Sequence, residues 1–271
     1  MLKRGFKWEL LKTFSASGRD CFSYQDVLEA YPEKDKFYLS KVLSAMVSMG
    51  MLIKLRRGIY YIVPTSADAE RYLPDWHLVA KCLMSNQKYY IGYYSAMQLH
   101  GLITQPAMRE IVVTDRQMKA TSRIIQGVEF RFVTHSYKRF FGFQSTWVNQ
   151  YDKVVVSDLE KTLTDALTRP SLSGGMVEIG KAVYETRHKV NLDKLTEYLL
   201  RNDSQAAIKR YLFLCFLFDV KRSPSHEILL AKKGHSYPLL DPSGPKEGVK
   251  NASFGLKINV DIETIKNAIY T

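Results

Sequence analysis

The first 63 residues begin with two short segments of helical hydrophobic spacing. In FKWELLKTF, Trp8, Leu11 and Phe14 recur at the spacing of one helix face. SYQDVLEAY begins at Ser23, a residue type whose hydroxyl caps helix N-termini, and Pro32 follows the segment and ends it. The pattern predicts two short helices.

A third segment, DKFYLSKVLSAMVSMG, has the clearest helical pattern of this region. Its core positions recur at i, i+3, i+4 and i+7: Leu39, Val42, Leu43 and Met46. Gly50 supplies the stop. At about 100° per residue, the opposite face carries an aromatic, a cation and three hydroxyls: Phe37, Lys41, Ser40, Ser44 and Ser48. We expect this small, polar face to approach another surface closely.

After Gly50 the period changes to two. Along MLIKLRRGIYYI, one set of side chains alternates with another: Met51, Ile53 and Leu55 with Leu52, Lys54 and Arg56. Arg57-Gly58 predicts a turn, after which IYYIV returns as a second strand. Three helices followed by a basic hairpin are typical of a winged helix-turn-helix, whose third helix enters the major groove while the wing lies on phosphates. The sequence predicts this domain over residues 1–63.

The remainder of the chain predicts a larger domain of mixed strands and helices. Residues 64–74, with PTSADAE, indicate a polar connection, and the C-terminal domain is expected over residues 75–271. It opens with a helix at 75–84, and Ser95 is expected to cap a short helix that ends at Gly101. Further segments predict strands at EIVVTD, VEFRFVTH, KVVVSD and FGLKINV, and helices at DLEKTLTDAL, GGMVEIGKAVYETRH, NLDKLTEYLLRN, SQAAIKRYLFLCFLFDV and residues 262–269. The expected fold class is α+β.

The positive net charge of the chain favours a polyanionic partner. The chain carries a formal net charge of +12, and residues 1–63 hold eleven Lys or Arg against six Asp or Glu. The predicted third helix and wing supply the expected DNA contacts: Phe37, Ser40, Lys41, Ser44, Lys54, Arg56 and Arg57. A second basic stretch comprises Lys119, Arg123, Arg131, His135, Lys138 and Arg139. It either extends the DNA footprint, or meets an acidic partner, or is a solvated surface.

The positions of the cysteines and histidines and the lengths of the apolar runs do not favour a disulfide-rich, metal-binding or membrane-spanning protein. Cys21, Cys82 and Cys215 are far apart and lack C-x-x-C spacing, so we expect neither a disulfide framework nor a zinc site, and a cytoplasmic location. The six histidines form no H-x-H or H-E-x-x-H motif, so no metal is expected, and no cofactor is expected. The longest apolar run, YLFLCFLF, is shorter than the ~20 residues of a membrane span. It predicts a buried helix.

Enzymatic motifs are weak. GMVEIGKA has the G-x(4)-G-K spacing of a phosphate loop, but Ala182 stands where that loop needs Ser or Thr, and the helical periodicity of the segment favours a plain helix start at Gly174-Gly175. A metal-dependent nuclease would pair Asp115 with Glu129. Asp158 and Glu160 are typical of a helix cap and first turn. We expect no catalytic residue.

Three sequence segments after the N-terminal domain resemble those of a known family: YYIGYYSAMQLHGLITQP, VVVSDLEKTLTDALTRPSLSGGMVEIGKAV and YPLLDPSGPKEGVKNASFGLKINV. In this order, with elements such as Leu99-His100-Gly101-Leu102 and Leu240-Asp241-Pro242, the chain resembles the AbiEi antitoxins of type IV toxin-antitoxin phage-defence systems. The resemblance implies that the N-terminal domain binds inverted repeats in its own promoter and represses the operon. It further implies that the C-terminal domain counteracts a nucleotidyltransferase-like toxin without a stable complex.

Three functional hypotheses therefore stay open. The first is a non-enzymatic DNA-binding repressor and antitoxin, with double-stranded DNA as partner. The second is a metal-dependent nuclease that uses Asp115 and Glu129. The third is a protein-interaction module without DNA binding.

Overall fold

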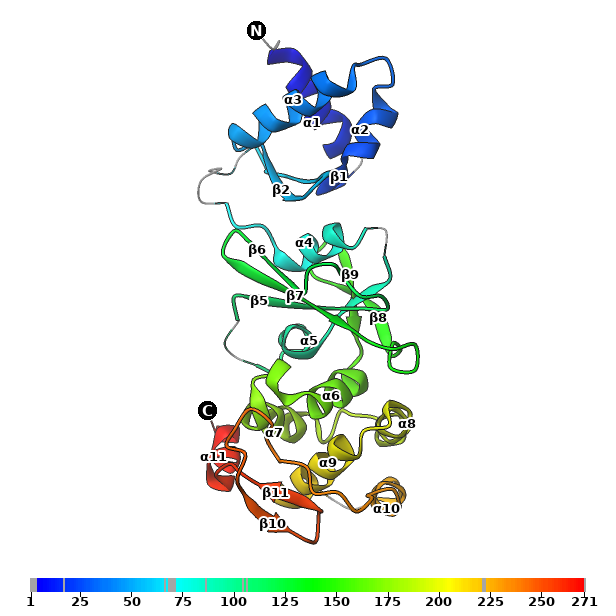
Figure 1. Ribbon diagram of the computed structural model, residues 1–271, viewed down its shortest axis with the longest axis vertical. Coiled ribbons are helices and arrows are strands. Elements are labelled where there is room, and N and C mark those ends of the chain that lie inside the picture. Colours follow the sequence, from blue (N-terminus) through cyan, green and yellow to red (C-terminus); the bar gives the residue numbers. More distant parts are fainter. Residues whose placement is uncertain are drawn as a thin grey trace. The chain divides into compact units, whose positions relative to one another are not determined.

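The computed structural model describes residues 4–16, 18–65, 67, 72–85, 87–103, 105, 107–220 and 223–270. Contacts divide the chain into two units (Figure 1). The first unit comprises Met1–Gln87 with Ile124–Val128, and the second comprises Lys88–Arg123 with Glu129–Thr271. The structure is α+β, as the sequence predicted. Within the described ranges, no helix combines the length and the apolar character that a membrane crossing needs.

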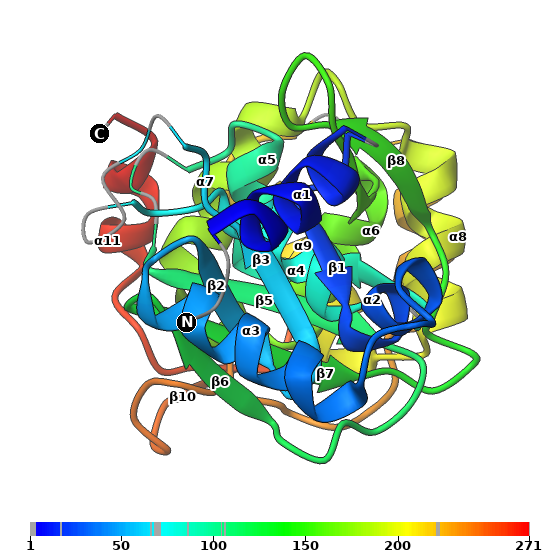
Figure 2. The ribbon, with the colours of Figure 1, turned by 90° about the horizontal axis from the view of Figure 1, so that it is seen from above.

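The described part of the first unit contains four helices and a small sheet. In chain order its elements are α1 (Arg4–Ser15), β1 (Cys21–Ser23), α2 (Tyr24–Ala30), α3 (Lys36–Ser48), β2 (Leu52–Arg56), β3 (Ile59–Ile62) and α4 (Trp76–Leu83). The strands form an antiparallel sheet in the order β1-β3-β2. Helices α1, α2 and α3 gather on one side of this sheet (Figure 2), and their shared core includes Phe22 of β1, Leu52 of β2 and Tyr60 of β3.

Local signals explain these helices. Ser23 begins α2 with a reciprocal cap: its Oγ accepts from the Asp26 amide at 3.0 Å, and the Asp26 carboxylate accepts from the Ser23 amide at 2.6 Å. The stripe that predicts α3 is confirmed, since Leu39, Val42, Leu43 and Met46 are all fully buried. The prediction for α1 was wrong in one residue.

The spacing placed Trp8 on one helix face with Leu11 and Phe14, yet Trp8 is 49% exposed, whereas Leu10 is fully buried beside those two residues. An α-helix turns by about 100° per residue, so Trp8 lies far around the helix from Phe14, six positions later. Leu10 lies four positions before Phe14 and therefore shares its face. Trp8 faces a cavity instead of the core.

The β2–β3 hairpin forms as predicted, with one irregularity. The register shifts between Lys54 and Arg56, which marks a bulge at Leu55. Because of this bulge, Leu52 and Leu55 are both buried, although strict alternation placed them on opposite faces. Gly58 takes the left-handed backbone of the turn, with φ at +75°.

Helix α4 belongs to the first unit, although the sequence assigned residues from 75 onward to the second domain. It packs on β2 and β3, and a disulfide joins Cys82 of α4 to Cys21 of β1. The expectation that the cysteines form no disulfide was therefore wrong. Cys21 pairs across the sheet with Tyr61 of β3, and the packing of α4 on β3 brings Cys82 to the same place. The two cysteines are 61 positions apart in the sequence, so no local pattern indicated their pairing.

The second unit begins with a mixed sheet. Its strands are β4 (Tyr89–Ile91), β5 (Arg109–Thr114), β6 (Ser122–Ile125), β7 (Val128–Thr134), β8 (Phe143–Trp147) and β9 (Lys153–Ser157). They lie in the order β6-β7-β5-β4-β9-β8, with parallel pairing of β5 to β7 and of β4 to β9. The tip of the β6–β7 hairpin is the segment that contacts assign to the first unit. β4, β6 and β8 were missed because they are short or largely exposed.

Helix α5 (Tyr93–Leu99) corrects another expectation. Ser95 was predicted to cap it, but the helix begins after Gly92, and Ser95 is fully buried. The Ser95 hydroxyl accepts from the Ile111 amide of β5 at 2.9 Å, so it ties the helix to the sheet. Gly92 is needed because a Cβ there would lie 2.9 Å from Val113 Cγ2.

A helical layer completes the second unit. Its elements are α6 (Leu159–Thr168), η1 (Pro170–Leu172), α7 (Gly175–Thr186), α8 (Leu192–Asn202), α9 (Gln205–Leu217), α10 (Pro224–Ala231), β10 (Val249–Asn251), β11 (Leu256–Ile258), α11 (Ile262–Asn267) and η2 (Ala268–Tyr270). The predicted helices at 159–168 and onward are confirmed. Asp158 caps α6 by accepting from the Lys161 amide at 2.8 Å. The apolar run YLFLCFLF lies in α9, which is buried along most of its length.

Candidate nucleic-acid interface

Helix α3 presents an exposed polar face. Asp35 caps its N-terminus and accepts from the Tyr38 amide at 2.8 Å. Phe37 is 67% exposed, and Ser40, Lys41 and Ser44 are exposed on the same helix that buries its opposite stripe. The Lys41 Nζ lies over the Phe37 ring, 4.3 Å from its centre. This cation–π contact, one helical turn apart, holds both side chains on the outer face.

Hydrogen bonds join the start of α3 and the turn of the β2–β3 hairpin to α2. The Tyr24 hydroxyl donates to the Lys36 carbonyl at 2.7 Å, and the Tyr24 amide donates to the Gly58 carbonyl at 2.7 Å. One residue at the start of α2 thus contacts both the first turn of α3 and the turn of the β2–β3 hairpin.

The three cations of the hairpin differ in exposure. Lys54 and Arg57 are exposed, whereas Arg56 is half-buried. The Arg56 Nε is closed off from solvent and has no hydrogen-bond partner among the residues that the structure describes. Lys54 and Arg57 are therefore the more accessible of the three to a polyanion.

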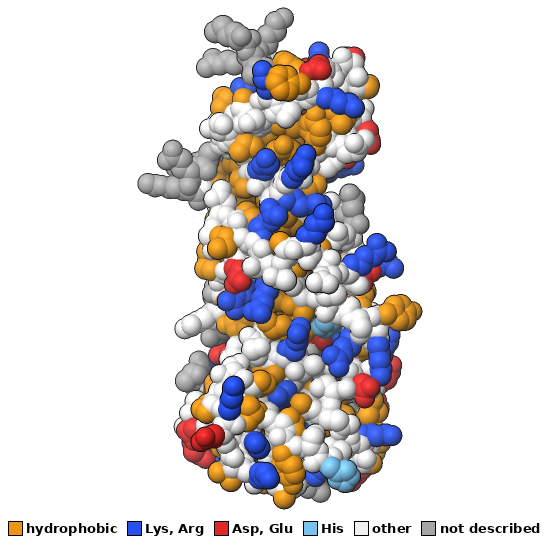
Figure 3. Space-filling model, viewed as in Figure 1, with side chains coloured by type: hydrophobic (Ala, Val, Ile, Leu, Met, Phe, Trp, Pro, Cys, Tyr) orange, Lys and Arg blue, Asp and Glu red, His pale blue; other side chains and the backbone are white. Residues whose placement is uncertain are grey.

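The second basic stretch does not form one free face. Lys138 makes an ion pair with Asp203 at 2.9 Å, and the Arg139 Nε donates to the Asn202 carbonyl at 3.1 Å. Lys119, Arg123 and Arg131 have exposed side chains. On the face drawn in Figure 3, Lys and Arg side chains lie in several separate groups.

His135 lies in the core and not on a basic surface. It is 6% exposed and contacts two buried tyrosines, with its Nδ1 3.0 Å from the Tyr90 hydroxyl and its Nε2 2.8 Å from the Tyr93 hydroxyl. Burial lowers the pKa of this imidazole, and the Asp165 carboxylate opposes that effect in part. His135 therefore adds no cation to the stretch at neutral pH.

A buried ion pair adjoins this histidine. Lys161 Nζ lies 2.5 Å from Asp165 Oδ1, and both residues are almost completely buried. The Tyr90 hydroxyl donates to the other carboxylate oxygen at 2.8 Å. Burial, followed by the nearby Asp165 charge, raises the pKa of Tyr90 well above its ordinary value. These groups satisfy one another inside the core, which is typical of a structural network.

The geometry separates the two carboxylates of the nuclease hypothesis. β5 and β7 run parallel with Glu129 opposite Arg109, whereas Asp115 follows the far end of β5. Six residues of extended chain place them about 20 Å apart, too far to share a metal ion. Glu129 is also bound to Arg109 at 2.7 Å. Among the residues with described positions, no cluster of three or more potential metal ligands occurs.

The motifs of the family resemblance contact each other in the second unit. The His100 Nε2 donates to the Ser157 carbonyl at 2.8 Å, which joins the first of the three segments quoted above to the second. The Asp241 carboxylate accepts from the Met176 amide at 2.8 Å, which joins the third segment to the start of α7. Asp241 therefore occupies the helix N-terminus where a phosphate loop would hold an anion. The motifs stabilise the fold of this unit.

Comparison with known proteins bears on the fold. No family model matches the chain, and no curated protein sequence matches it. Among solved structures, the chain is similar to the Rv2827c protein from Mycobacterium tuberculosis, with a TM-score of 0.69 and 15% sequence identity. The match covers 96% of this chain and 94% of that one. At this identity the likeness shows a shared fold.

Proposed function

We propose that the chain is a sequence-specific DNA-binding transcriptional repressor whose first unit is a winged helix-turn-helix. The element order α1-β1-α2-α3-β2-β3 and the sheet order β1-β3-β2 support this assignment. In such a domain α3 reads bases in the major groove and the β2–β3 wing contacts phosphates.

The observation that carries the proposal is the outer face of α3. A helix of 13 residues is about 20 Å long, and the major groove, about 12 Å wide, admits a helix with small outer side chains. Ser40 and Ser44 keep this face small, while Lys41 adds a cation. The exposed Lys54 and Arg57 on the neighbouring hairpin supply phosphate contacts, and Arg56 contributes through the exposed part of its side chain.

The test is a titration of the full chain with the DNA upstream of its own gene, at several salt concentrations. Each lost phosphate contact flattens the log–log salt dependence by about 0.9. Lys54→Ala and Arg57→Ala should each reduce the slope by this amount, whereas Lys232→Ala, at an exposed position in the second unit, should leave it unchanged. Binding that does not depend on salt would favour a protein-interaction module instead.

Ser40 and Lys41 test base reading. Substitution of either by Ala should narrow the difference in affinity between the upstream fragment and unrelated DNA, since base contacts carry sequence choice. An equal loss of affinity for both DNAs would assign these residues to the phosphate backbone.

We further propose that the chain is an antitoxin of the AbiEi type, acting in the cytoplasm on inverted repeats in its own promoter and against a nucleotidyltransferase-like toxin without a stable complex. The support is the family resemblance of the second unit. Disulfides are rare in a reducing compartment, so the proposed location requires that the Cys21–Cys82 bond persists there. Co-expression with a toxin encoded beside the gene should restore growth without co-purification of the two proteins. Persistent toxicity would refute this role.

A further inference from the structure

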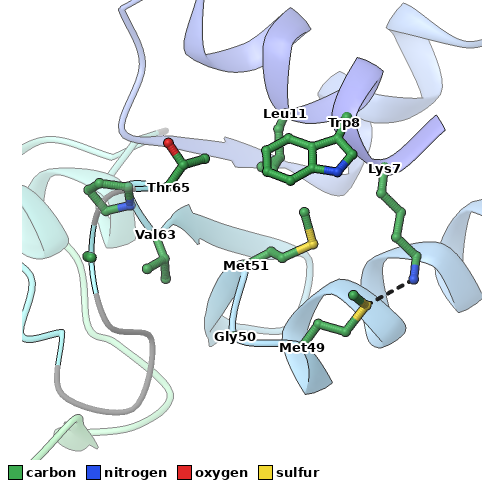
Figure 4. Close-up of a pocket in the computed structure, with 10 residues that line it drawn as sticks. Lys7, Trp8, Leu11, Met49, Gly50, Met51, Val63 and Thr65 are labelled. Carbon is green, nitrogen blue, oxygen red and sulfur yellow. Dashed lines mark hydrogen bonds between the residues drawn. The ribbon is translucent and has the colours of Figure 1, made fainter. Parts of the chain in front are cut away.

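The first unit contains a cavity of about 540 Å³ that the proposed DNA contacts do not use. Its walls come from α1, the connection between α3 and β2, and the segment after β3 (Figure 4). The lining includes Lys7, Trp8, Met49, Met51 and Thr65. Small-molecule sites commonly occupy roughly 300–1,000 Å³, so the volume suits a compact organic ligand.

The walls favour an aromatic ligand. Trp8 and Met49 are 49% and 58% exposed, although residues of these types are usually buried. Figure 4 shows the Trp8 indole and the Met49 and Met51 side chains around the same space. An indole offers a face for a second ring, and thioethers contact aromatic rings favourably while adapting to their shape.

One cation stands among these apolar groups. Among the lining residues that the structure describes, Lys7 is the single charged one, and its Nζ donates to the Met49 Sδ at 3.1 Å. A thioether is a weak acceptor. Within the described part of the chain, no carboxylate forms an ion pair with Lys7. The ammonium group is thus available to an anion that enters the cavity.

We propose that this cavity binds a small aromatic carboxylate. The ring lies against Trp8, Met49 and Met51, and the carboxylate replaces the thioether as acceptor for Lys7. The binding site itself is independent of DNA recognition. A ligand in this cavity also touches Met49, directly after α3. Any effect of the ligand on DNA binding therefore rests on the proposed function.

The direct test uses the full chain labelled with ¹³C at its methionine methyl groups, titrated with 4-phenylbutyrate and, separately, with 4-phenyl-1-butanol in the absence of DNA. From the affinity per atom of small ligands, we expect a dissociation constant of roughly 0.1–3 mM for the carboxylate. The alcohol should bind about tenfold more weakly because it lacks the charge-assisted contact with Lys7. Met49 and Met51 signals should shift, while that of the buried Met176 should not.

Two variants locate the site. Lys7→Met should abolish the preference for the carboxylate, whereas Lys12→Met, at an exposed position of the same helix, should retain it. Thr65→Trp should fill the cavity from an exposed position and remove binding of both compounds. Thermal unfolding of each variant verifies its fold. The proposal is overturned if neither compound shifts Met49 and Met51, if Lys7→Met keeps the preference, or if Thr65→Trp binds normally. Because no DNA is present, these outcomes are separate from any failure of DNA binding.

Discussion

The Cys21–Cys82 disulfide should supply a large part of the stability of the first unit. The perturbation is the double substitution Cys21→Ser and Cys82→Ser, compared with Cys215→Ser, which removes the free buried thiol of the second unit. The disulfide closes a loop over 61 residues. The chain-entropy relation gives about 4 kcal/mol at 25 °C for a loop of this length, and native disulfides typically contribute about 2–4 kcal/mol.

Urea unfolding followed by tryptophan fluorescence measures the effect. Trp147→Phe in all variants removes the tryptophan of the second unit and leaves Trp8 and Trp76 as reporters of the first. With an m value of about 2 kcal/mol/M, the midpoint should fall by about 1–2 M urea in the double variant. A thiol reductant should produce the same fall in the parent protein and none in the double variant.

Two results would refute this reasoning. The denatured, unreduced protein should expose one thiol, that of Cys215, and three thiols would show that the disulfide does not form. If the disulfide is present but the midpoint of the double variant is unchanged, loop closure does not stabilise the first unit.

Three further predictions concern the second unit. Asp165→Asn should lower the free energy of unfolding by about 3–5 kcal/mol, because it leaves the Lys161 ammonium buried without its carboxylate. Because folding lowers the pKa of His135, the unfolded chain binds more protons than the folded chain as the pH falls below about 6.5. The free energy of unfolding is therefore highest, with respect to this residue, above about pH 6.5, and it decreases as the pH falls from there to the pKa of His135 in the folded chain. His135→Gln should therefore flatten the dependence of stability on pH in this window. Gly92→Ala should cost about 1–3 kcal/mol, because its Cβ would lie 2.9 Å from Val113 Cγ2. Chemical denaturation at controlled pH measures all three.

Matched variants distinguish these effects from general disruption. Adding Lys161→Met to Asp165→Asn should recover part of the loss, since the uncompensated charge is then absent; no recovery would contradict the ion-pair argument. His235→Gln, at an exposed position, should leave the pH dependence unchanged. A stable Gly92→Ala variant would show that α5 shifts away from the sheet at no cost.

Several parts of the fold were accessible from sequence because their causes are local. The stripe of α3 and the cap at Ser23 depend on residues within a few positions of each other. The same holds for the Gly58 turn and for Asp158 at the start of α6. In the candidate site, the helical spacing of the buried residues of α3 also predicted which face of that helix is exposed.

Predictions failed where distant residues decide the outcome. Ser95 has the composition of a helix cap, yet the amide of Ile111 on β5 uses its hydroxyl. His135 lies in a basic stretch of sequence, yet strand pairing directs it toward Tyr90 and Tyr93. Asp115 and Glu129 seemed compatible with one metal site until the parallel register of β5 and β7 separated them.

The sequence by itself determined the three helices α1, α2 and α3, the β2–β3 hairpin and the polar outer face of α3, because helix and hairpin periodicity are properties of neighbouring residues. Only the tertiary structure decided that Cys21 meets Cys82, and that Trp8 and Lys7 face a cavity with Met49 and Met51. These contacts join segments tens of residues apart. Strand order and helix packing bring such segments together, and no local pattern records them.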